Sequence, residues 1–215
     1  FVDLFDWDDG DMIDDQDKIR MLVDPTSDYV KAMVAALNRA KDDVIIASMG
    51  GNSRATTGNI ILPTTQKIAV GGTGLTKAKI IQARKLFRRN EADNHNGEEL
   101  FITYTAQAAA DILADTTLTS ADYLAGKFLE EGDVEGRWMG FTWIPSERTP
   151  YDGATRKLYA WAKSGVTLGK GQDITTKVGE DPGKGFNVRI YAKQSIGAVR
   201  TEEEKVVEIA VTEAA

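Results

Sequence analysis

The longest regular pattern in the chain is an apolar stripe at helical spacing between Pro25 and Ser48. Residues three and four positions apart share one face of a helix, so this stripe predicts an amphipathic helix. Proline is favoured at the first helical position, and the Gly50–Gly51 pair predicts the end of the helix. At 1.5 Å per residue the helix is about 36 Å long. The stripe consists of Tyr29, Val30, Met33, Val34, Leu37, Val44 and Ile45.

A second amphipathic helix is predicted from Lys77 to Asn90, with Thr76 at its N-cap. The positions predicted to be buried are Ile80, Ile81, Ala83 and Phe87. The cations predicted to point outward are Lys77, Lys79, Arg84, Lys85, Arg88 and Arg89. The outer face of this helix is therefore strongly basic.

The rest of the pattern mixes short strands and short helices without a regular βαβ repeat, which predicts the α+β class. Strands are predicted at residues 68–70, 99–105, 138–145, 186–194 and 205–213, the last two as a final pair. Short helices are predicted at residues 107–114, 121–132 and 156–163. Residues 50–75 are rich in glycine and threonine and are predicted to form an extended excursion.

Charge changes the picture at the start of the chain. The first twenty residues hold eight aspartates against one lysine and one arginine, so they carry nearly all of the formal net charge of −7. This acidic run includes Asp8, Asp9, Asp11, Asp14 and Asp15. It is interpreted as a solvated acidic arm, as a nonstandard divalent-cation site, or as an arm that docks on a basic surface of a partner. The ligand spacing of an EF-hand is not present, because Phe5 and Trp7 occupy two of the ligand positions when Gly10 is aligned.

The basic helix also has three interpretations. Its cations form a solvated face, contact nucleic-acid phosphates without sequence preference, or pair with an acidic arm of another subunit. No aromatic residues interleave on that face, so base stacking is not indicated.

Candidate chemistry is sparse. The chain has no cysteine and a single histidine, His95, so thiolate metal sites and histidine-based catalytic triads are not expected. The run from Gly71 to Lys77 resembles a phosphate loop, but its lysine does not follow a glycine directly. Ser146 and Ser195 lack the nucleophile-elbow pattern. We therefore expect no enzyme activity, no catalytic or metal site and no cofactor, and the lack of a long apolar run predicts no membrane partner.

Taken in order, several phrases resemble the major capsid proteins of tailed phages, which have the Hong Kong 97-type coat fold. The first is FDWDDGDMIDDQDKIRMLVDPTSDYVKAMVAALNRAKDDVIIASMGG, followed by LTKAKIIQARKLFRRN and ELFITYTAQAAADILAD. The series continues as TSADYLAGKFLEEGDVEGRWMGFTWIPSE and closes with AKQSIGAVRTEEEKVVEIAV. The resemblance covers nearly the full chain, and the series in this order is more specific than any one phrase.

The resemblance implies a Hong Kong 97-like architecture with a spine helix, a peripheral domain, an axial domain and an extended loop. Residues 1–24 would be the returning strand of the extended loop, and residues 25–48 the spine helix. Residues 25–74 and 162–215 would form the peripheral domain and residues 75–161 the axial domain. The start at Phe1, in the middle of a strand pattern, is then explained if the outgoing strand of the loop lies upstream.

The implied function is self-assembly into hexamers and pentamers of an icosahedral head around double-stranded DNA, held by nonspecific contact. Scaffolding, portal and decoration proteins are the other expected partners, and the location is the virion capsid, assembled in the cytoplasm of a host bacterium. The expected subunit-interface residues are Asp8, Asp9, Asp11, Asp14, Asp15, Arg84, Arg88 and Arg89. Two alternatives remain open: a nanocompartment or gene-transfer-particle shell, and an acidic calcium-binding module.

Overall fold

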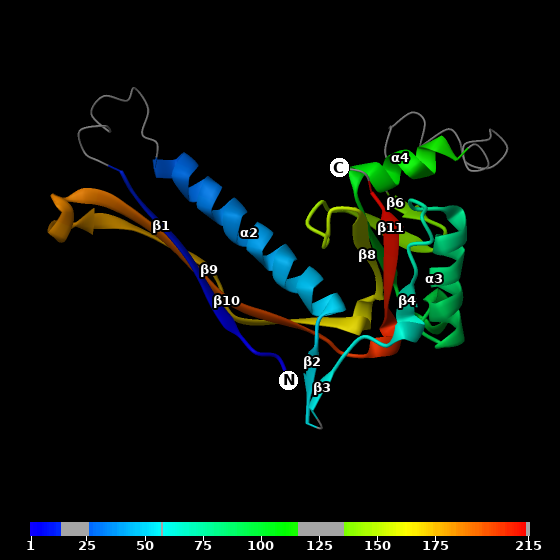
Figure 1. The fold of residues 1–215 in the computed structure, drawn as a ribbon. Coiled ribbons are helices and arrows are strands. Elements are labelled where there is room, and N and C mark those ends of the chain that lie inside the picture. The colour runs from blue at the N-terminus through cyan, green and yellow to red at the C-terminus, as the bar shows by residue number, and fades with distance from the viewer. Residues whose placement is uncertain (14–25, 57, 116–135, 214–215) are drawn as a thin grey trace. The chain divides into compact units, whose positions relative to one another are not determined.

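A computed structural model of the chain describes residues 1–13, 26–56, 58–115 and 136–213. It divides into two compact units (Figure 1). The six-stranded unit contains Phe1, Ile46–Thr167 and Val199–Ala215. The three-stranded unit contains Val2–Ile45 and Leu168–Ala198.

The six-stranded unit is built on one mixed sheet with the strand order β4-β11-β8-β5-β7-β6. Its strands are β4 (Lys67–Ile68), β5 (Leu100–Tyr104), β6 (Gly136–Trp138), β7 (Phe141–Pro145), β8 (Thr155–Ala162) and β11 (Val206–Thr212). Two helices pack on this sheet, α3 (Lys77–Arg89) and α4 (Ala106–Ala114). A small hairpin of β2 (Ser53–Ala55) and β3 (Gly58–Ile60) completes the unit.

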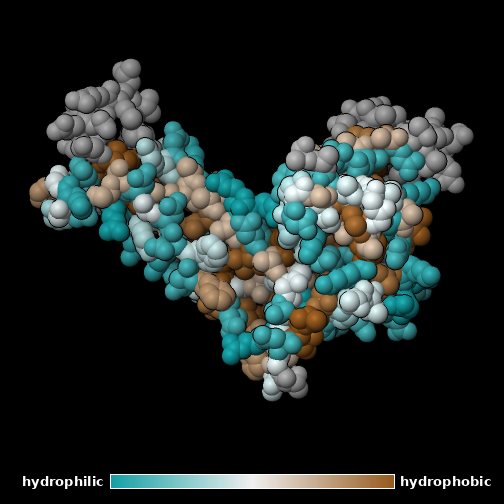
Figure 2. Space-filling view, in the orientation of Figure 1, coloured by the Kyte–Doolittle hydropathy of each residue, from teal (hydrophilic) through white to brown (hydrophobic). Residues whose placement is uncertain are grey.

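The main hydrophobic core lies between this sheet and its two helices. Ile80 and Phe87 of α3 are fully buried against Ile102, Leu158 and other strand residues. The ring of Phe87 meets that of Phe141 edge to face, with the ring centroids 6.0 Å apart. On the face shown in Figure 2, hydrophilic residues of this unit surround scattered hydrophobic ones. Burial of the helical stripes thus stabilises the sheet on which the helices lie.

The prediction of a helix at residues 156–163 is wrong, because this segment is strand β8. β8 lies inside the sheet and pairs antiparallel with both β11 and β5. Leu158, Tyr159 and Ala160 are consecutive and almost completely buried. A strand buried on both faces loses the two-residue alternation that distinguishes a strand from a helix.

The predicted strand at residues 138–145 is two strands joined by a tight turn. β6 ends at Trp138 and β7 begins at Phe141. Met139 and Gly140 between them have φ of 49° and 83°, so both adopt the left-handed conformation of a type I′ hairpin turn. Apolar residues on both sides of Gly140 concealed the turn, and Met139 is an unusual residue at positive φ.

The three-stranded unit has the strand order β1-β10-β9, with helix α2 beside the sheet (Figure 1). Its elements are β1 (Phe5–Ile13), α2 (Thr26–Gly50, of which residues up to Ile45 belong to this unit), β9 (Val166–Asp181) and β10 (Asn187–Arg200). Met33 and Leu37 of α2 pack on Ile13, Ile190 and Ala192. The amide of Gln194 in β10 also donates to the Leu37 carbonyl at 2.7 Å. Val30, Met33 and Leu37 of the stripe predicted for residues 25–48 therefore cover this sheet, whereas Tyr29, predicted to be on the same stripe, is 39% exposed.

The expectation that the last two strands form a pair is wrong. β10 pairs with β1, whereas β11 pairs with β8 and β4 in the other sheet. Both segments are strands as predicted, but local alternation does not determine which strand is the neighbour. The helix predicted at residues 121–132 lies outside the described residues.

Two predictions of side-chain direction on α3 are also wrong. Ile81 is 49% exposed, and the side chain of Lys79 is buried. Lys79 turns inward because its ammonium group finds carbonyl oxygens in the preceding loop. The division into peripheral and axial domains stays a prediction, and the two compact units follow other boundaries.

Candidate functional site

The acidic run forms an exposed edge strand in the three-stranded unit. The aspartates of β1 at positions 6, 8, 9 and 11 are all exposed. Successive side chains of a strand point to opposite faces of the sheet, so Asp8 and Asp9 diverge. The register places Asp8 opposite Lys193, and Asp9 opposite Ala192. Asp14 and Asp15 lie outside the described residues.

Asp8 has a partner inside its own subunit. The Tyr191 hydroxyl donates to Asp8 Oδ2 at 3.3 Å. Burial, and next the Asp8 carboxylate, raise the pKa of the Tyr191 hydroxyl. Asp9 and Asp11 lie on the other face of β1, opposite Ala192 and Ile190, and both are exposed; Asp11 Oδ1 accepts from the Met12 amide at 2.8 Å.

The geometry of β1 does not favour the divalent-cation interpretation. A calcium ion takes six to eight oxygen ligands that converge on one point. Alternation along β1 sends neighbouring carboxylates to opposite faces instead. Among the described residues, no group of three or more histidine, aspartate or glutamate side chains is placed to hold a metal ion.

The basic helix α3 uses its predicted cations in different ways. Arg84 is half-buried and donates through Nη1 to the Met139 carbonyl, so it clamps the β6–β7 turn within the subunit. Asn94 binds the same turn, through the Gly140 carbonyl at 3.2 Å. Arg84 therefore points toward this turn, and its role as a subunit-interface residue stays a prediction.

Arg88 and Arg89 are exposed, as predicted. Arg88 lies 3.7 Å from the buried carboxylate of Asp93, and its side chain is 67% exposed. In the described part of the chain, Arg89 and Lys85 have no ion-pair partner. The exposed residues of α3 form a stripe along the helix, which we call the α3 stripe. Its members are Ala78, Ile81, Gln82, Lys85, Arg88 and Arg89. It contains three cations and no carboxylate.

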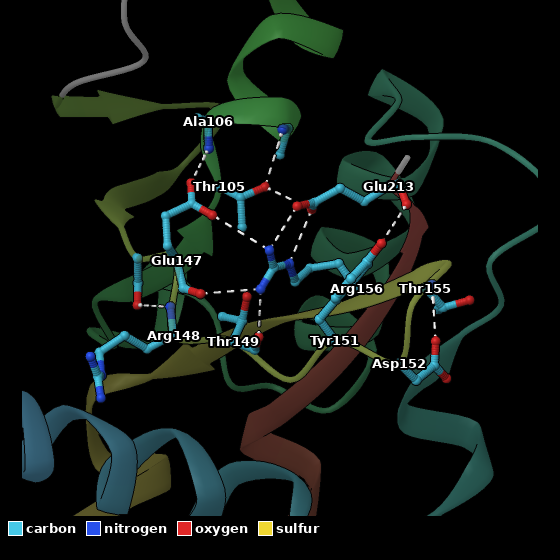
Figure 3. A network of polar contacts seen from close by, with 12 residues as sticks. Thr105, Ala106, Glu147, Arg148, Thr149, Tyr151, Asp152, Thr155, Arg156 and Glu213 are labelled. Atoms are coloured by element: carbon cyan, nitrogen blue, oxygen red, sulfur yellow. Dashed lines mark hydrogen bonds and ion pairs between the residues drawn. The ribbon is translucent and has the colours of Figure 1, made fainter. Parts of the chain in front are cut away.

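Sequence reasoning missed a polar network that joins four segments of the six-stranded unit (Figure 3). Arg156 of β8 is its centre. Its Nε and Nη2 donate to the two carboxylate oxygens of Glu213 at 3.1 and 2.7 Å. Its Nη1 donates to the carbonyls of Glu147 and Thr149 at 3.1 and 2.9 Å. One guanidinium thus binds the chain after β11 to the loop after β7.

The same network caps helix α4. Thr105 is the N-cap residue, and its Oγ1 accepts from the Ala108 amide and donates to Glu213. Glu147 accepts from the Ala106 amide, which places a carboxylate at the positive end of the helix dipole. The hydrogen bond from Arg156 is the main cause that lowers the pKa of Glu213. Arg156 lay in a segment predicted to be helical, and no local signal connects it with Glu213.

None of the described helices has both the length and the apolar character that a membrane span requires.

The sequence matches the family model of the phage capsid protein over residues 1–213. The chain belongs to the phage capsid protein family. No curated protein matches the sequence.

Solved capsid structures share the fold of this capsid protein. A structure of Mycobacterium phage Che8 has a TM-score of 0.72 at 17% identity, covering 95% of this chain and 70% of that one. The capsid asymmetric unit of cyanophage Pam1 has a TM-score of 0.72 at 13% identity, covering 100% and 76%. The capsid of a native GTA particle has a TM-score of 0.68 at 16% identity, covering 100% and 74%.

These findings confirm the predicted α+β class and the Hong Kong 97-like fold. They also confirm a structural major capsid protein, a component of the virion capsid that associates with copies of itself into capsomers. Members of this family are structural proteins and not known enzymes.

Proposed function

We propose that this capsid protein assembles into hexamers and pentamers that close an icosahedral head around double-stranded DNA. Assembly takes place in the cytoplasm of a host bacterium, with scaffolding, portal and decoration proteins as partners and with nonspecific contacts to the packaged DNA. The family match over residues 1–213 supports this proposal. Closed symmetric shells need repeated contacts between unlike surfaces of identical subunits, and two such surfaces of opposite charge are present.

The proposed contact joins the acidic strand β1 of one subunit to the α3 stripe of its neighbour. Asp9 and Asp11 are exposed on β1, and Arg88 and Arg89 are exposed on α3. Asp8, Asp14 and Asp15 belong to the same acidic run, whereas Arg84 is engaged by the Met139 carbonyl. An exposed ion pair contributes only about 0–1 kcal/mol, so the contact acts through its many copies in a shell.

The domain assignment is part of the same proposal. Residues 25–48 would be the spine helix, with residues 1–24 entering it as the returning strand of the extended loop. Residues 75–161 would supply the axial domain, and residues 25–74 and 162–215 the peripheral domain. The continuous α2, with one face packed on the β1-β10-β9 sheet, supports the spine assignment.

Electron microscopy of the full-length product, with a scaffolding protein supplied, tests the assembly. Closed shells are expected, and persistent monomers under all assembly conditions would overturn the proposal. The contact itself is tested by charge reversal. Arg88→Glu with Arg89→Glu should lower the shell yield, and adding Asp9→Lys and Asp11→Lys to the same chain should restore it.

Salt and a control variant sharpen the test. Because exposed charges are screened within a Debye length of about 8 Å at physiological ionic strength, the yield should fall as salt rises. Lys31→Glu is the matched control, since Lys31 is an exposed cation on α2 with its own partner, Asp28. If the Arg88 and Arg89 reversal changes the yield no more than Lys31→Glu does, the contact is wrong while the capsid function stands.

The alternative shells have their own discriminating observations. A nanocompartment or gene-transfer-particle shell would be distinguished by the packaged contents of the purified particle. The calcium-binding module would be shown by isothermal titration, and the diverging aspartates of β1 predict no binding at millimolar calcium.

A further inference from the structure

Lys79 is a charged side chain that the capsid function leaves unexplained. It is the third residue of α3, and only 6% of it is exposed. Lysine is almost never fully buried unless its ammonium group is paired. No carboxylate lies within salt-bridge distance of this ammonium group among the described residues, so its partners are of another kind.

Four carbonyl oxygens surround the ammonium group. Nζ lies 2.8 Å from the Val70 oxygen, 2.7 Å from that of Thr73 and 3.0 Å from that of Gly74. The fourth oxygen belongs to Ala210 of β11, also at 3.0 Å. An ammonium group has only three N–H donors, so it cannot donate a separate hydrogen bond to each of four oxygens. The four oxygens instead surround the positive charge as a cage. Rings of backbone carbonyls are how proteins replace the hydration shell of a monovalent cation.

The loop is shaped to present these oxygens. Gly71 and Gly72 have φ of 58° and 67°, and the Thr73 amide donates to the Val70 carbonyl at 3.2 Å. Two successive left-handed residues form a tight turn that only glycine adopts without strain. The turn directs the carbonyls of Val70 and Thr73 toward Lys79. This inward arrangement of oxygens is the reverse of a phosphate loop, which presents amide hydrogens to its ligand.

Two further hydrogen bonds fix the loop that forms the cage. Asp111 of α4 accepts from the Leu75 amide at 3.0 Å, and its charge favours the protonated form of Lys79. The Thr212 amide of β11 donates to the Thr73 carbonyl at 2.9 Å. Burial acts in the other direction and is the larger effect, so the pKa of Lys79 is lowered from its usual value. The cage therefore connects the loop, α3, α4 and β11 through one buried charge.

We propose that residues 70–74 together with Ala210 form a binding site for a monovalent alkylammonium-type cation, which Lys79 fills with its own side chain. The bound charge holds the exposed Gly71–Gly72 turn in one conformation before the start of α3. The site is independent of the proposed subunit contact, so either proposal can fail without the other.

Chemical rescue tests the site. Lys79→Ala deletes the atoms of one n-propylammonium ion, so that ion is the probe. The variant should melt about 5–10 °C below the parent chain, because four partly buried carbonyls each lose the ammonium donor, although those of Val70 and Thr73 keep an amide donor. Addition of n-propylammonium chloride should recover at least half of this loss. Tetramethylammonium chloride at the same ionic strength, which has no N–H donors, should not.

Two outcomes would overturn the proposal. One is an equal rise in melting temperature with both salts; the other is the same loss in Lys85→Ala, which removes an exposed lysine of the same helix. If Lys79→Ala does not fold, the cage is tested in the parent chain instead, by measuring how fast each lysine is acetylated by an amine-reactive ester under native conditions. Lys79 should react at least tenfold more slowly than Lys85, and equal rates would refute the cage.

Discussion

The Arg156–Glu213 pair offers the sharpest test of the six-stranded unit. The perturbation is Arg156→Met, which keeps much of the side-chain length and removes the charge. In the structure the side chains of Arg156 and Glu213 are only 13% and 11% exposed. The substitution removes two hydrogen bonds to Glu213 and two to the carbonyls of Glu147 and Thr149.

The expected magnitude follows from this burial. Breaking a fully buried ion pair costs about 3–5 kcal/mol, because one charge stays buried without its partner. Some water still reaches this pair, so we expect a loss of about 2–3 kcal/mol in the free energy of unfolding. For a chain of this size the melting temperature should fall by about 4–12 °C. Glu213→Gln keeps one acceptor and should cost less.

The pH dependence has a defined sign. Arg156 lowers the pKa of Glu213 below its usual value of 4.5, so the carboxylate is favoured in the folded state. A carboxylate whose pKa is lower in the folded state stabilises the protein at any pH above its unfolded-state pKa. This stabilisation is lost as the pH falls through the folded-state pKa. The stability difference between the parent chain and Glu213→Gln should therefore be full at pH 7 and shrink below pH 4.5.

Urea denaturation of the parent chain, both single variants and the double variant at pH 7 and pH 3.5 gives the coupling energy. Glu99→Gln is the control, since its pair with Lys163 is largely exposed and should not contribute measurably to stability. A coupling energy below about 0.5 kcal/mol at pH 7 would refute the reasoning, as that is the usual error of additivity. If the stability difference between the parent chain and Glu213→Gln grows as the pH falls, the assigned direction of the Glu213 pKa shift is wrong.

Two further predictions concern the same unit. Arg200→Met should lower the free energy of unfolding by about 2–4 kcal/mol in urea denaturation, because it leaves the carbonyls of Met49, Gly51 and Ile60 without their donor; an unchanged midpoint would contradict this. Gly140→Ala should cost about 1–3 kcal/mol in thermal denaturation, since φ is 83° and the new Cβ would overlap Arg84. Gly179→Ala, with open space around it, is its neutral control.

Some of the functional surface could be predicted because it depends on exposure alone. The described aspartates of β1 and the cations Arg88 and Arg89 are exposed, as the sequence pattern predicted. Lys79 and Arg84 are on the same helix but turn toward carbonyl oxygens of residues 70–74 and 139. Sequence spacing shows which residues share a helix face, but it does not show where a neighbouring backbone presents an acceptor.

The sequence by itself determined the helices at α2 and α3, most of the strands and the family of this capsid protein. These features rest on local periodicity and on the order of segments along the chain, and both can be recognised without knowing which residues are in contact. The tertiary structure alone decided that β8 is a buried central strand, that β10 and β11 enter different sheets, and that Arg156 meets Glu213. Each of these features depends on contacts between residues that are far apart in the chain. The energies of such contacts cannot be inferred from the local sequence pattern.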